Sequence, residues 1–483
     1  MRRRGRAGLL CKLVSYRTLA ACFPQVRRTR CKRRKRGRRE TCWTAAIVAK
    51  QRRAKAAMSL LCKKALHRCQ LTWLLLAAAA AAVLLIRLVR RRRRRPKPRQ
   101  GKLRVAFAHP DLGIGGAERL VVDAALGLRG RGHDVTIYTA RHDPRRCFDE
   151  TRDGTLRVVV AGDWLPKRVL GRCYALCASL RMVAVALRAA RDGPDVVVVD
   201  QVATAVPVAR AACAAPVVFY CHYPDKLLCV NRQNPLTRLY RAPLDWGEET
   251  CTGLADVVLV NSRFTAGVFR RAFPRLAVAP EVLYPPLSLA EVAEAPRDAA
   301  LLLSINRFER KKNLGLAVET LALLPKRVRL VLAGGYDPDL PENVEHAREL
   351  EELAARLGVA DRVTQRRSVS GDEKARLLAR CACLLYTPEN EHFGIVPLEA
   401  MHARTPVVAV DSGGPRESVV DGVTGRLLAP DPQIWARAVA DLLGDAAGRR
   451  AMGERGRERV RELFSLDAFA DRLERICVGV LTR

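Results

Sequence analysis

TPENEHFGIVPLEA, residues 387–400, joins two kinds of segment within fourteen residues. The four residues before it, CLLY at 383–386, form an apolar run typical of a buried strand. Pro397 suits the first turn of a helix, because its fixed φ matches and its missing N–H is not needed there. We therefore expect a strand-to-helix junction, with Glu391 on the loop and Glu399 inside the helix.

The chemistry of this junction favours a phosphorylated ligand. Gly394 lets backbone N–H groups at the start of the helix approach a ligand, and these groups with the helix dipole favour a phosphate. The carboxylates of Glu391 and Glu399 would repel a phosphate but accept hydrogen bonds from hydroxyl groups. A phosphorylated sugar carries both groups. Taken alone, the pair is as consistent with two solvated glutamates.

Charge divides the chain into two parts. Residues 1–100 contain 32 Lys and Arg and one acid, so they carry +31 of the formal net charge of +37. The remaining 383 residues have an ordinary charge balance and enough apolar content for two domains. Of the 16 cysteines, ten lie in this second part without metal-type C-x-x-C spacing, which favours reduced thiols and a cytosolic enzyme.

The basic part contains a hydrophobic segment. We interpret residues 1–70 as a basic, irregular tail, 71–89 as a membrane segment interrupted by Arg87, and 90–100 as a basic linker. The segment is short for a bilayer span, so it either spans with Arg87 reaching the interface or lies in the interface. The basic flank after it predicts a cytosolic enzyme body. A start at Met58 would leave a simple signal anchor, and an Ala-rich stretch without a membrane role is the alternative.

The charge of residues 1–57 also raises the hypothesis of nucleic-acid binding. The tail has few aromatic side chains for stacking on bases, and it has no recognisable fold. We therefore expect no nucleic-acid partner. Binding located wholly in this tail, with steep salt dependence, would support the opposite interpretation.

Beyond residue 100, apolar strand-like runs alternate with helix-like segments, as in parallel βα units. One series runs through 103–108, 135–138, 196–199, 217–220, 257–260 and 282–284, and ends at Pro285 and Pro286. A second runs through 301–305, 328–333, 383–386 and 407–410. The expected fold is α/β, with two Rossmann-like domains at residues 101–290 and 291–483. Ligands in such sheets bind at the carboxyl ends of the strands, so the crevice facing both domains is the expected site.

Motifs collect at those strand ends. HPDLGIGGAERL, residues 109–120, follows the first strand and contains Gly115 and Gly116, which let the backbone approach a phosphate, although the full G-x-G-x-x-G fingerprint is absent. His222 follows a later strand, as His109 follows the first. In SINRFERKKN, residues 304–313, Arg307 and Lys312 can neutralise a diphosphate, whereas the residues between them resemble a solvated turn. DSGGPRE, residues 411–417, is expected beside the Glu391 loop.

Together these residues resemble the retaining GT-B glycosyltransferases of family 4, over nearly all of residues 101–475. HPDLGIGGAERL, LYRAPLDW, LVNSRFTAGVF, SINRFERKKNL, AGGYD and NEHFGIVPLEAM are similar to members that add α-1,3 and α-1,6 mannose during dolichol-linked oligosaccharide synthesis. The resemblance implies GDP-mannose as donor, a mannosylated chitobiosyl diphosphodolichol as acceptor, and an endoplasmic reticulum membrane location with the catalytic domains on the cytosolic face. It also implies a membrane surface and other early-pathway glycosyltransferases as partners.

The resemblance also implies roles for particular residues. Glu399 would bind the ribose and Glu391 the transferred mannose, while Arg307 and Lys312 would hold the diphosphate with Gly115 and Gly116. His222 would lie near the reacting carbon. Phe393, Gly394 and Ile395 would complete the donor site. The family pattern implies no cofactor and no required metal, and the acid pair Asp337 and Asp339 is interpreted as a turn.

Two alternatives remain open from the sequence. The chain could be another retaining GT-B enzyme with a different donor or lipid acceptor, or a non-catalytic membrane scaffold. Residues 164–190 are mostly apolar, with Arg181, Arg188 and Arg191 expected near one helical face. This segment could enter a membrane surface, or pack within its domain with a solvated edge.

Overall fold

The computed structural model describes residues 101–169, 173–229, 232–288 and 295–482. The expectations for residues 1–100, including the hydrophobic segment at 71–89, lie outside these ranges. No helix within the described ranges combines the length and apolar character needed to cross a bilayer.

The first lobe is built on a seven-stranded parallel sheet with the order β3-β2-β1-β4-β5-β6-β7. Its strands are β1 (Arg104–His109), β2 (Asp134–Thr139), β3 (Arg157–Val160), β4 (Val196–Asp200), β5 (Val217–Cys221), β6 (Val257–Val260) and β7 (Glu281–Val282). Its helices are α2 (Gly116–Gly130), α3 (Tyr174–Arg191), α4 (Ala205–Ala212), α5 (Asp225–Leu228), α6 (Pro235–Thr252) and α7 (Arg263–Ala272), with a short 3-10 turn, η1 (Asp149–Thr151).

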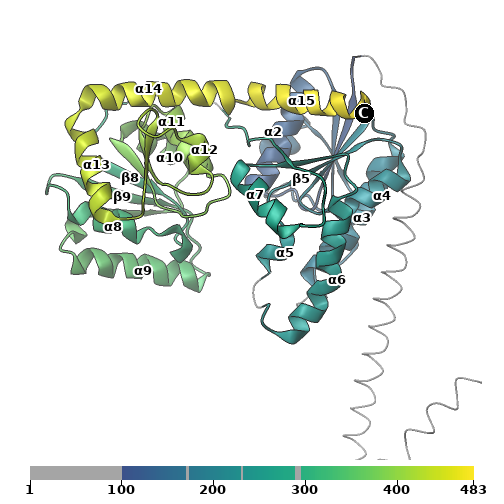
Figure 1. Ribbon diagram of the computed structural model, residues 1–483, viewed down its shortest axis with the longest axis horizontal. Helices are drawn as coiled ribbons and strands as arrows, with labels where there is room; N and C mark the ends of the chain where they lie inside the picture. Colours follow the sequence, from purple (N-terminus) through teal and green to yellow (C-terminus); the bar gives the residue numbers. More distant parts are fainter. Residues whose placement is uncertain (1–100, 170–172, 230–231, 289–294, 483) are drawn as a thin grey trace, which may run out of the picture. The chain divides into compact units, whose positions relative to one another are not determined.

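The second lobe repeats this plan with a six-stranded parallel sheet, in the order β10-β9-β8-β11-β12-β13. Its strands are β8 (Leu301–Ile305), β9 (Arg329–Gly334), β10 (Val363–Arg367), β11 (Cys383–Tyr386), β12 (Val407–Val410) and β13 (Gly425–Leu428). Its helices are α8 (Gly315–Ala322), α9 (Pro341–Arg356), α10 (Gly371–Arg380), α11 (Ile395–His402), α12 (Pro415–Ser418), α13 (Pro432–Gly444) and α14 (Ala446–Leu463), with 3-10 turns η2 (Arg310–Lys312) and η3 (Ala360–Arg362). Figure 1 labels many of these elements.

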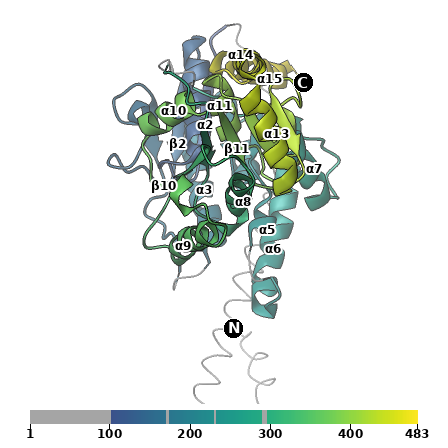
Figure 2. The same ribbon diagram turned by 90° about the vertical axis from the view of Figure 1, so that its left-hand side faces the viewer.

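Helices cover both faces of each sheet because the central strands are apolar on both sides. In the second lobe, α8, α9 and α13 share one core with the sheet, and α10, α11 and α14 share the core on the opposite face. Figure 2 shows several of these helices around the strands. In the first lobe, α3, α4 and α7 pack on one face and α2 on the other. The α/β fold with two Rossmann-like sheets is confirmed.

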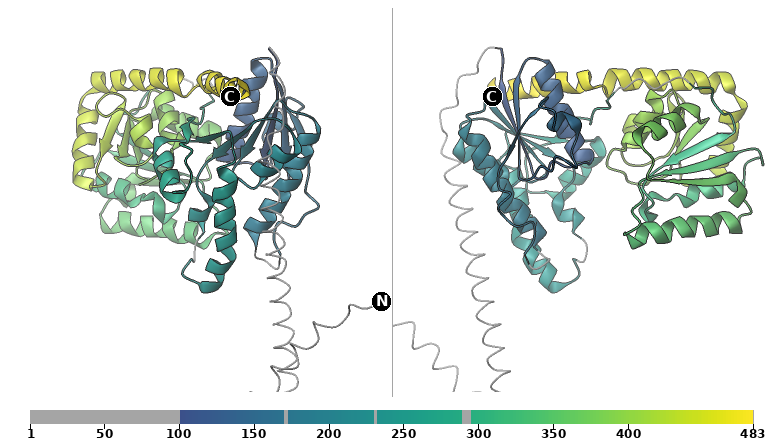
Figure 3. Two further views of the ribbon diagram at one scale, coloured as in Figure 1. Left: turned by 45° about the vertical axis from the view of Figure 1, so that its right-hand side comes forward. Right: turned by 180° about the vertical axis from the view of Figure 1, so that it is seen from behind.

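The last helix, α15 (Leu466–Thr482), packs in the first lobe although the sequence assigned it to the second domain. Phe469, Leu473, Cys477 and Val480 are buried in the same core as α2. Gly127 of α2 permits this packing, because a Cβ there would lie 2.7 Å from Cβ of Ala470. Figures 1 and 3 show α15 beside α2. The chain therefore returns to the first lobe after completing the second.

Helix α3 shows how residues 164–190 are used. Met182, Val185, Ala186 and Ala189 are buried in the core of the first lobe, whereas Leu180 and Leu187 are exposed. The solvated edge that the packing interpretation placed on this helix does not include Arg181. The Arg181 side chain is buried, and its Nη2 donates to the Ala140 carbonyl at 2.7 Å. The packing interpretation is correct for this helix.

Candidate active site

A cavity of about 780 Å³ lies at the carboxyl ends of strands from both sheets. In each sheet the chain reverses its winding between the first strand and the fourth, at β1/β4 and β8/β11, and such switch points are where ligands bind in open α/β sheets. The second lobe contributes most of the expected donor residues. They are Glu391, Phe393, Gly394, Ile395 and Glu399. The first lobe contributes Gly116 and His222.

Glu391 is fixed by a lysine from another element. It lies on the loop after β11, and its Oε2 forms an ion pair with Nζ of Lys312. Both side chains are more than four-fifths buried, so this pair is screened less than a surface pair. Lys312 lies in the 3-10 turn η2, which precedes α8. It contacts the cavity through Glu391 rather than by lining it.

Glu399 is held in a similar way from α11. Its Oε1 accepts a hydrogen bond from Nζ of Lys374 on α10 at 2.6 Å. Its Oε2 is buried and has no hydrogen-bond partner among the described residues. A buried carboxylate oxygen without a hydrogen-bond partner costs free energy. This atom is therefore suited to accept a hydrogen bond from a hydroxyl group of a ligand. Lys374 was not identified from the sequence, because its segment looks like an ordinary solvated helix.

Arg307 follows β8, as expected, but its guanidinium does not line the cavity. Its Nη1 lies 2.8 Å from Oε1 of Glu309, and the Arg307 side chain is 60% exposed. Glu309 was interpreted as part of a solvated turn, which is wrong, since it is buried and also pairs with Lys311 at 3.0 Å. Glu309 therefore holds the side chains of Arg307 and Lys311 at the edge of the site. Arg307 is the residue that was expected to bind the diphosphate.

The glycine-rich loop after β12 packs directly on the Glu391 loop, as expected. Gly414 N donates to the Glu391 carbonyl at 2.8 Å, and Asn390 N donates to Ser412 Oγ at 2.9 Å. A Cβ at Gly414 would lie 2.1 Å from the Phe393 carbonyl oxygen, and one at Gly413 would lie 2.5 Å from the Glu391 carbonyl oxygen. Only glycine permits this approach, which fixes the loop that carries Glu391.

In the first lobe, a buried carboxylate joins two histidines at three strand ends. Asp200, the last residue of β4, accepts from Nδ1 of His109 on one oxygen and from Nε2 of His222 on the other, each at 2.8 Å. His109 Nε2 also lies 3.1 Å from the Asp111 carbonyl. Both His109 nitrogens therefore face acceptors, so the ring is protonated. Asp200 was missed in the sequence, where it ends an apolar run and resembles the start of a turn.

The charges in this group are strongly coupled. Burial lowers the pKa of His109, but hydrogen bonds and charge from Asp200 and Glu118 outweigh burial and raise it to about 9. Burial raises the pKa of Asp200, but the charges and hydrogen bonds of His222 and His109 lower it to about 2. His222 is thus held beside a permanent carboxylate, with its ring 23% exposed in the cavity.

Gly115 is the N-cap residue of α2 and Gly116 is the first residue of that helix, but only Gly116 lines the cavity. A Cβ at Gly115 would lie 2.3 Å from Oε2 of Glu118, whereas one at Gly116 would meet no atom within 4 Å. Gly115 therefore allows close packing of the turn against Glu118. The structure does not bring Arg307, Lys312 or Gly115 to the cavity wall.

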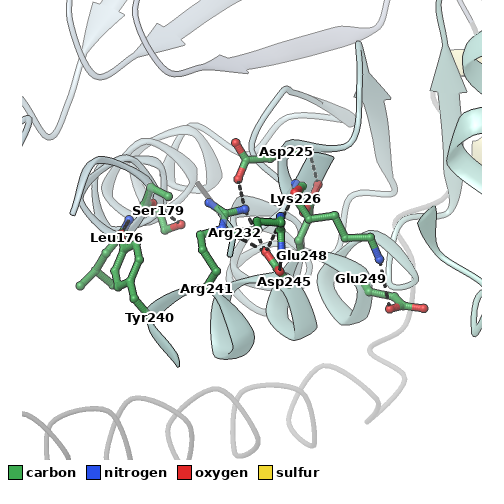
Figure 4. Close-up of polar contacts among 11 residues, drawn as sticks. Leu176, Ser179, Asp225, Lys226, Arg232, Tyr240, Arg241, Asp245, Glu248 and Glu249 are labelled. Atoms are coloured by element: carbon green, nitrogen blue, oxygen red, sulfur yellow. Dashed lines mark hydrogen bonds and ion pairs between the residues drawn. The ribbon is translucent and has the colours of Figure 1, made fainter. Parts of the chain in front are cut away.

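A network of charged residues shapes the side of the cavity formed by α5 and α6 (Figure 4). Buried Arg241 bonds to Asp225 at 2.7 Å and to Asp245 at 3.1 Å, and Arg232 bonds to Asp245 at 2.7 Å. Glu248 accepts from the backbone N–H groups of Asp225 at 2.6 Å and of the next residue at 2.9 Å. Burial and the Asp225 charge raise the pKa of Glu248 to about 7, although the hydrogen bonds from those N–H groups act to lower it. The network holds Asp225, Leu228 and Glu248 in the cavity wall.

Several contacts join the loops of the two sheets around the cavity. The ring of Tyr223 packs edge-on to that of His392, with centroids 4.0 Å apart. Ser262 Oγ donates to the His392 carbonyl at 2.5 Å. Glu417 accepts from the backbone N–H of Arg263 at 2.7 Å. Nothing in the sequence pointed to His392 beyond its position beside Glu391.

The expected turn at Asp337 and Asp339 is observed, since Asp339 N donates to Asp337 Oδ1 at 2.9 Å. Across the described ranges, no group of three or more His, Cys, Asp or Glu side chains is arranged to hold a metal ion.

This fold and site define a glycosyltransferase, and comparison with known proteins agrees. Residues 114–290 match the family model described as Glycosyltransferase Family 4, and residues 289–459 match Glycosyl transferases group 1. Among solved structures, sucrose-phosphate synthase from Thermosynechococcus elongatus aligns with a TM-score of 0.64 at 23% identity, over 79% of this chain and all of that one. Anabaena HepE, solved with UDP and glucose, gives 0.57 at 21% identity, over 78% of this chain and all of that one. These similarities establish the fold.

Curated relatives narrow the family further. The human alpha-1,3/1,6-mannosyltransferase ALG2 is 49% identical over 405 residues, which cover 79% of this chain and 97% of that protein. The protein of the same name from Rhizomucor pusillus is 46% identical over 421 residues, covering 79% of this chain and 92% of that one. The chain belongs to this family of alpha-1,3/1,6-mannosyltransferases.

Proposed function

We propose that this enzyme transfers mannose from GDP-mannose, with retention, to Man1GlcNAc2-diphosphodolichol. The first addition makes an α-1,3 linkage and the second an α-1,6 linkage, in the synthesis of the lipid-linked oligosaccharide for N-glycosylation. The observation that carries the proposal is the pair of lysine-held glutamates in the cavity. Glu391 is paired with Lys312, and Glu399 leaves one buried oxygen unpaired. The names of the curated relatives support mannose as the transferred sugar.

The donor would lie along the second lobe. The buried Oε2 of Glu399 would accept a hydrogen bond from a ribose hydroxyl, and the Glu391 carboxylate would accept hydrogen bonds from mannose hydroxyls. Backbone N–H groups at the start of α11, beside Gly394, would face the diphosphate. Lys312 lies beside the site through its ion pair with Glu391, and Arg307 would turn from Glu309 towards the phosphates as charge develops there. Phe393 and Ile395 would pack against the donor from the same loop.

Transfer would proceed with the acceptor hydroxyl approaching the same face of mannose from which GDP departs. The bond from C1 to the phosphate oxygen breaks, the bond from C1 to the acceptor oxygen forms, and the hydroxyl proton passes to the departing phosphate. Catalysis then consists of positioning and of stabilising the leaving diphosphate by cations. His222, held by Asp200, would lie near the reacting carbon and hydrogen-bond the sugar. No step requires a metal.

The acceptor lipid would approach from the first lobe. Leu228 lines the cavity and is 60% exposed, and Leu236 and Leu239 on α6 are 69% and 73% exposed, with Arg238 between them. Exposed apolar side chains beside a cation suit a membrane interface. The enzyme would thus act at the cytosolic face of the endoplasmic reticulum membrane, with other early-pathway glycosyltransferases as partners.

Mannose transfer to a synthetic phytanyl-diphosphate trisaccharide carrying one mannose tests the proposal. We expect the wild-type enzyme to add two mannoses from GDP-mannose. Glu391→Ala should lower the rate by about 100-fold, because the mannose hydroxyls lose a fixed acceptor and Lys312 loses its partner. Glu389→Ala, an exposed residue on the same loop, is the matched control and should leave the rate unchanged. A folded wild-type protein that forms no product would overturn the proposal.

A further inference from the structure

The proposed donor site leaves several cavity residues of the first lobe without a role. They come from three helices and are Ser179 of α3, Asp225 and Leu228 of α5, and Leu244 and Glu248 of α6. The residues proposed to hold the sugar and the ribose of the donor belong to the second lobe. The side chains from α3, α5 and α6 therefore face the part of the cavity that is left for the acceptor.

Asp225 has a carboxylate that is both fixed and accessible to a ligand. It is the first residue of α5 and follows the short loop that carries His222. Its Oδ2 accepts a hydrogen bond from Nη2 of Arg241 at 2.7 Å, and the Arg241 side chain is only 7% exposed. The Asp225 side chain is 53% exposed and lines the cavity. A buried arginine thus orients a carboxylate that a ligand can reach.

The backbone of Asp225 is held from α6 as well. Oε1 of Glu248 accepts from the backbone N–H of Asp225 at 2.6 Å, and its Oε2 accepts from that of Lys226 at 2.9 Å. Arg241 is itself held by Asp245, whose Oδ1 accepts from its Nε at 3.1 Å. The three α6 residues recur at helical spacing and share one face of the helix, as Figure 4 shows. A carboxylate that is ordered in this way loses little freedom when a ligand binds.

The charge of Asp225 decides which part of a ligand it suits. A carboxylate repels a diphosphate, both that of the donor and that which joins the acceptor to its lipid, but it accepts hydrogen bonds from hydroxyl groups. Leu228 and Leu244 add apolar surface to the same wall, and binding sites commonly combine such surface with a few fixed polar groups. The mannose of the donor already has a carboxylate in Glu391. Asp225 therefore suits the hydroxyl groups of the acceptor sugar.

We propose that Asp225 binds a hydroxyl group of the acceptor oligosaccharide and so determines the affinity of the enzyme for that substrate. The inference rests on the proposed function and assigns a residue to its acceptor site. Arg241 and Glu248 are positioning residues in this arrangement, because each acts through Asp225. Donor binding does not involve the three residues.

Steady-state kinetics with each substrate varied in turn tests the assignment. The acceptor is the synthetic phytanyl-diphosphate trisaccharide that carries one mannose. Asp225→Asn keeps the shape of the side chain but removes its charge, so KM for this acceptor should rise by about tenfold. The KM for GDP-mannose should stay unchanged, and kcat should change by less than about threefold. Asp153→Asn is the matched control, because Asp153 is exposed and precedes β3 at the amino ends of the strands, and it should change neither KM.

Calorimetric titration with GDP shows separately whether each variant is folded with an intact donor site. If Asp225→Asn binds GDP normally but raises both KM values, lowers kcat alone or matches Asp153→Asn, the proposal is wrong. Should Asp225→Asn fail to bind GDP, Glu248→Gln decides instead, since it disturbs the hold on the Asp225 backbone and leaves the carboxylate in place. A rise confined to the acceptor KM supports the proposal, and wild-type values overturn it.

Failure of the proposed function gives a different result. In that case the folded wild-type protein transfers no mannose to this acceptor. If only the role of Asp225 is wrong, the wild-type protein still adds mannose and the variant does so with the same acceptor KM.

Discussion

At the scale of single residues, the site is defined by how its charged groups are held. Glu391 and Glu399 each have a lysine partner from a different element, and Asp200 has two histidine partners. Such partners fix a side chain before a ligand arrives, so less ordering remains for binding. The sequence identified Glu391, Glu399, Lys312 and His222, but not Lys374 or Asp200.

Lys374 acts through Glu399, so its replacement should affect donor binding more than turnover. Lys374→Met should raise KM for GDP-mannose by about tenfold, because a charge-assisted hydrogen bond of roughly 1.5–3 kcal/mol no longer orients the Glu399 carboxylate. The kcat should change by much less. Steady-state kinetics measures both, with exposed Lys326→Met as the control. A fall in kcat at unchanged KM would contradict this role.

The pair of His109 and Asp200 should make stability depend on pH in a defined way. The pKa of His109 is raised from 6.5 to about 9, so its contribution is complete below pH 6.5 and is lost as pH rises through 9. Because the pKa of Asp200 is lowered from 3.8 to about 2, its contribution is complete above pH 3.8 and is lost as pH falls through 2. The free energy of unfolding should fall on the order of 2 kcal/mol between pH 6 and 9.5.

Asp200→Asn isolates this effect, because it removes the charge that raises the pKa of His109. Urea unfolding at several pH values should show a flatter profile in this variant than in the wild-type protein. Exposed Asp361→Asn should keep the wild-type profile. A profile in Asp200→Asn as steep as that of the wild-type protein would show that another group titrates.

At the scale of elements, sequence patterns predicted the inner strands better than the outer ones. Residues 257–260, 301–305, 383–386 and 407–410 form strands with the expected bounds, because strands buried on both faces appear as continuous apolar runs. The edge strands β3, β10 and β13 were missed. β10, with sequence VTQRR, is mostly exposed, so its pairing with β9 leaves no apolar signal.

The contact between the two loops of the second lobe should be sensitive to a single methyl group. Gly414→Ala would place its Cβ 2.1 Å from the Phe393 carbonyl oxygen, so the Glu391 loop must move. We expect a melting temperature lower by several degrees and mannosyl transfer reduced by about tenfold or more. A Cβ added at Gly444 would meet no atom within 4 Å, so Gly444→Ala should change neither the melting temperature nor the rate of mannosyl transfer. Equal effects of both substitutions would contradict the assignment.

At the scale of the whole molecule, the two-sheet plan followed from the sequence but the position of α15 did not. The apolar positions of α15 repeat with helical spacing, which predicts a buried face without indicating which lobe buries it. Charged contacts specify the partner, since Glu474 lies 3.3 Å from Arg131 and 2.9 Å from His133. These ion pairs join residues more than 340 positions apart in the sequence. The hydrophobic periodicity of a helix carries no information about such distant partners.

Truncating one buried side chain of α15 should therefore destabilise the first lobe. Leu473 is 2% exposed in the core shared with α2, so Leu473→Ala should lower the free energy of unfolding by about 2–5 kcal/mol. Val478→Ala, on the exposed face of the same helix, should change it by less than about 0.5 kcal/mol. Chemical denaturation measures the difference. A negligible effect at Leu473 would mean that α15 leaves the lobe in solution.

The return of α15 also sets the order in which this protein is completed during synthesis. The strands of the first lobe leave the ribosome early, but Phe469, Leu473 and Cys477 of their core emerge only after residues 301–463. The second lobe, in contrast, is complete when α14 emerges. The nascent first lobe must therefore expose the apolar face of α2 while the second lobe is translated, and a chaperone bound during that interval would protect it.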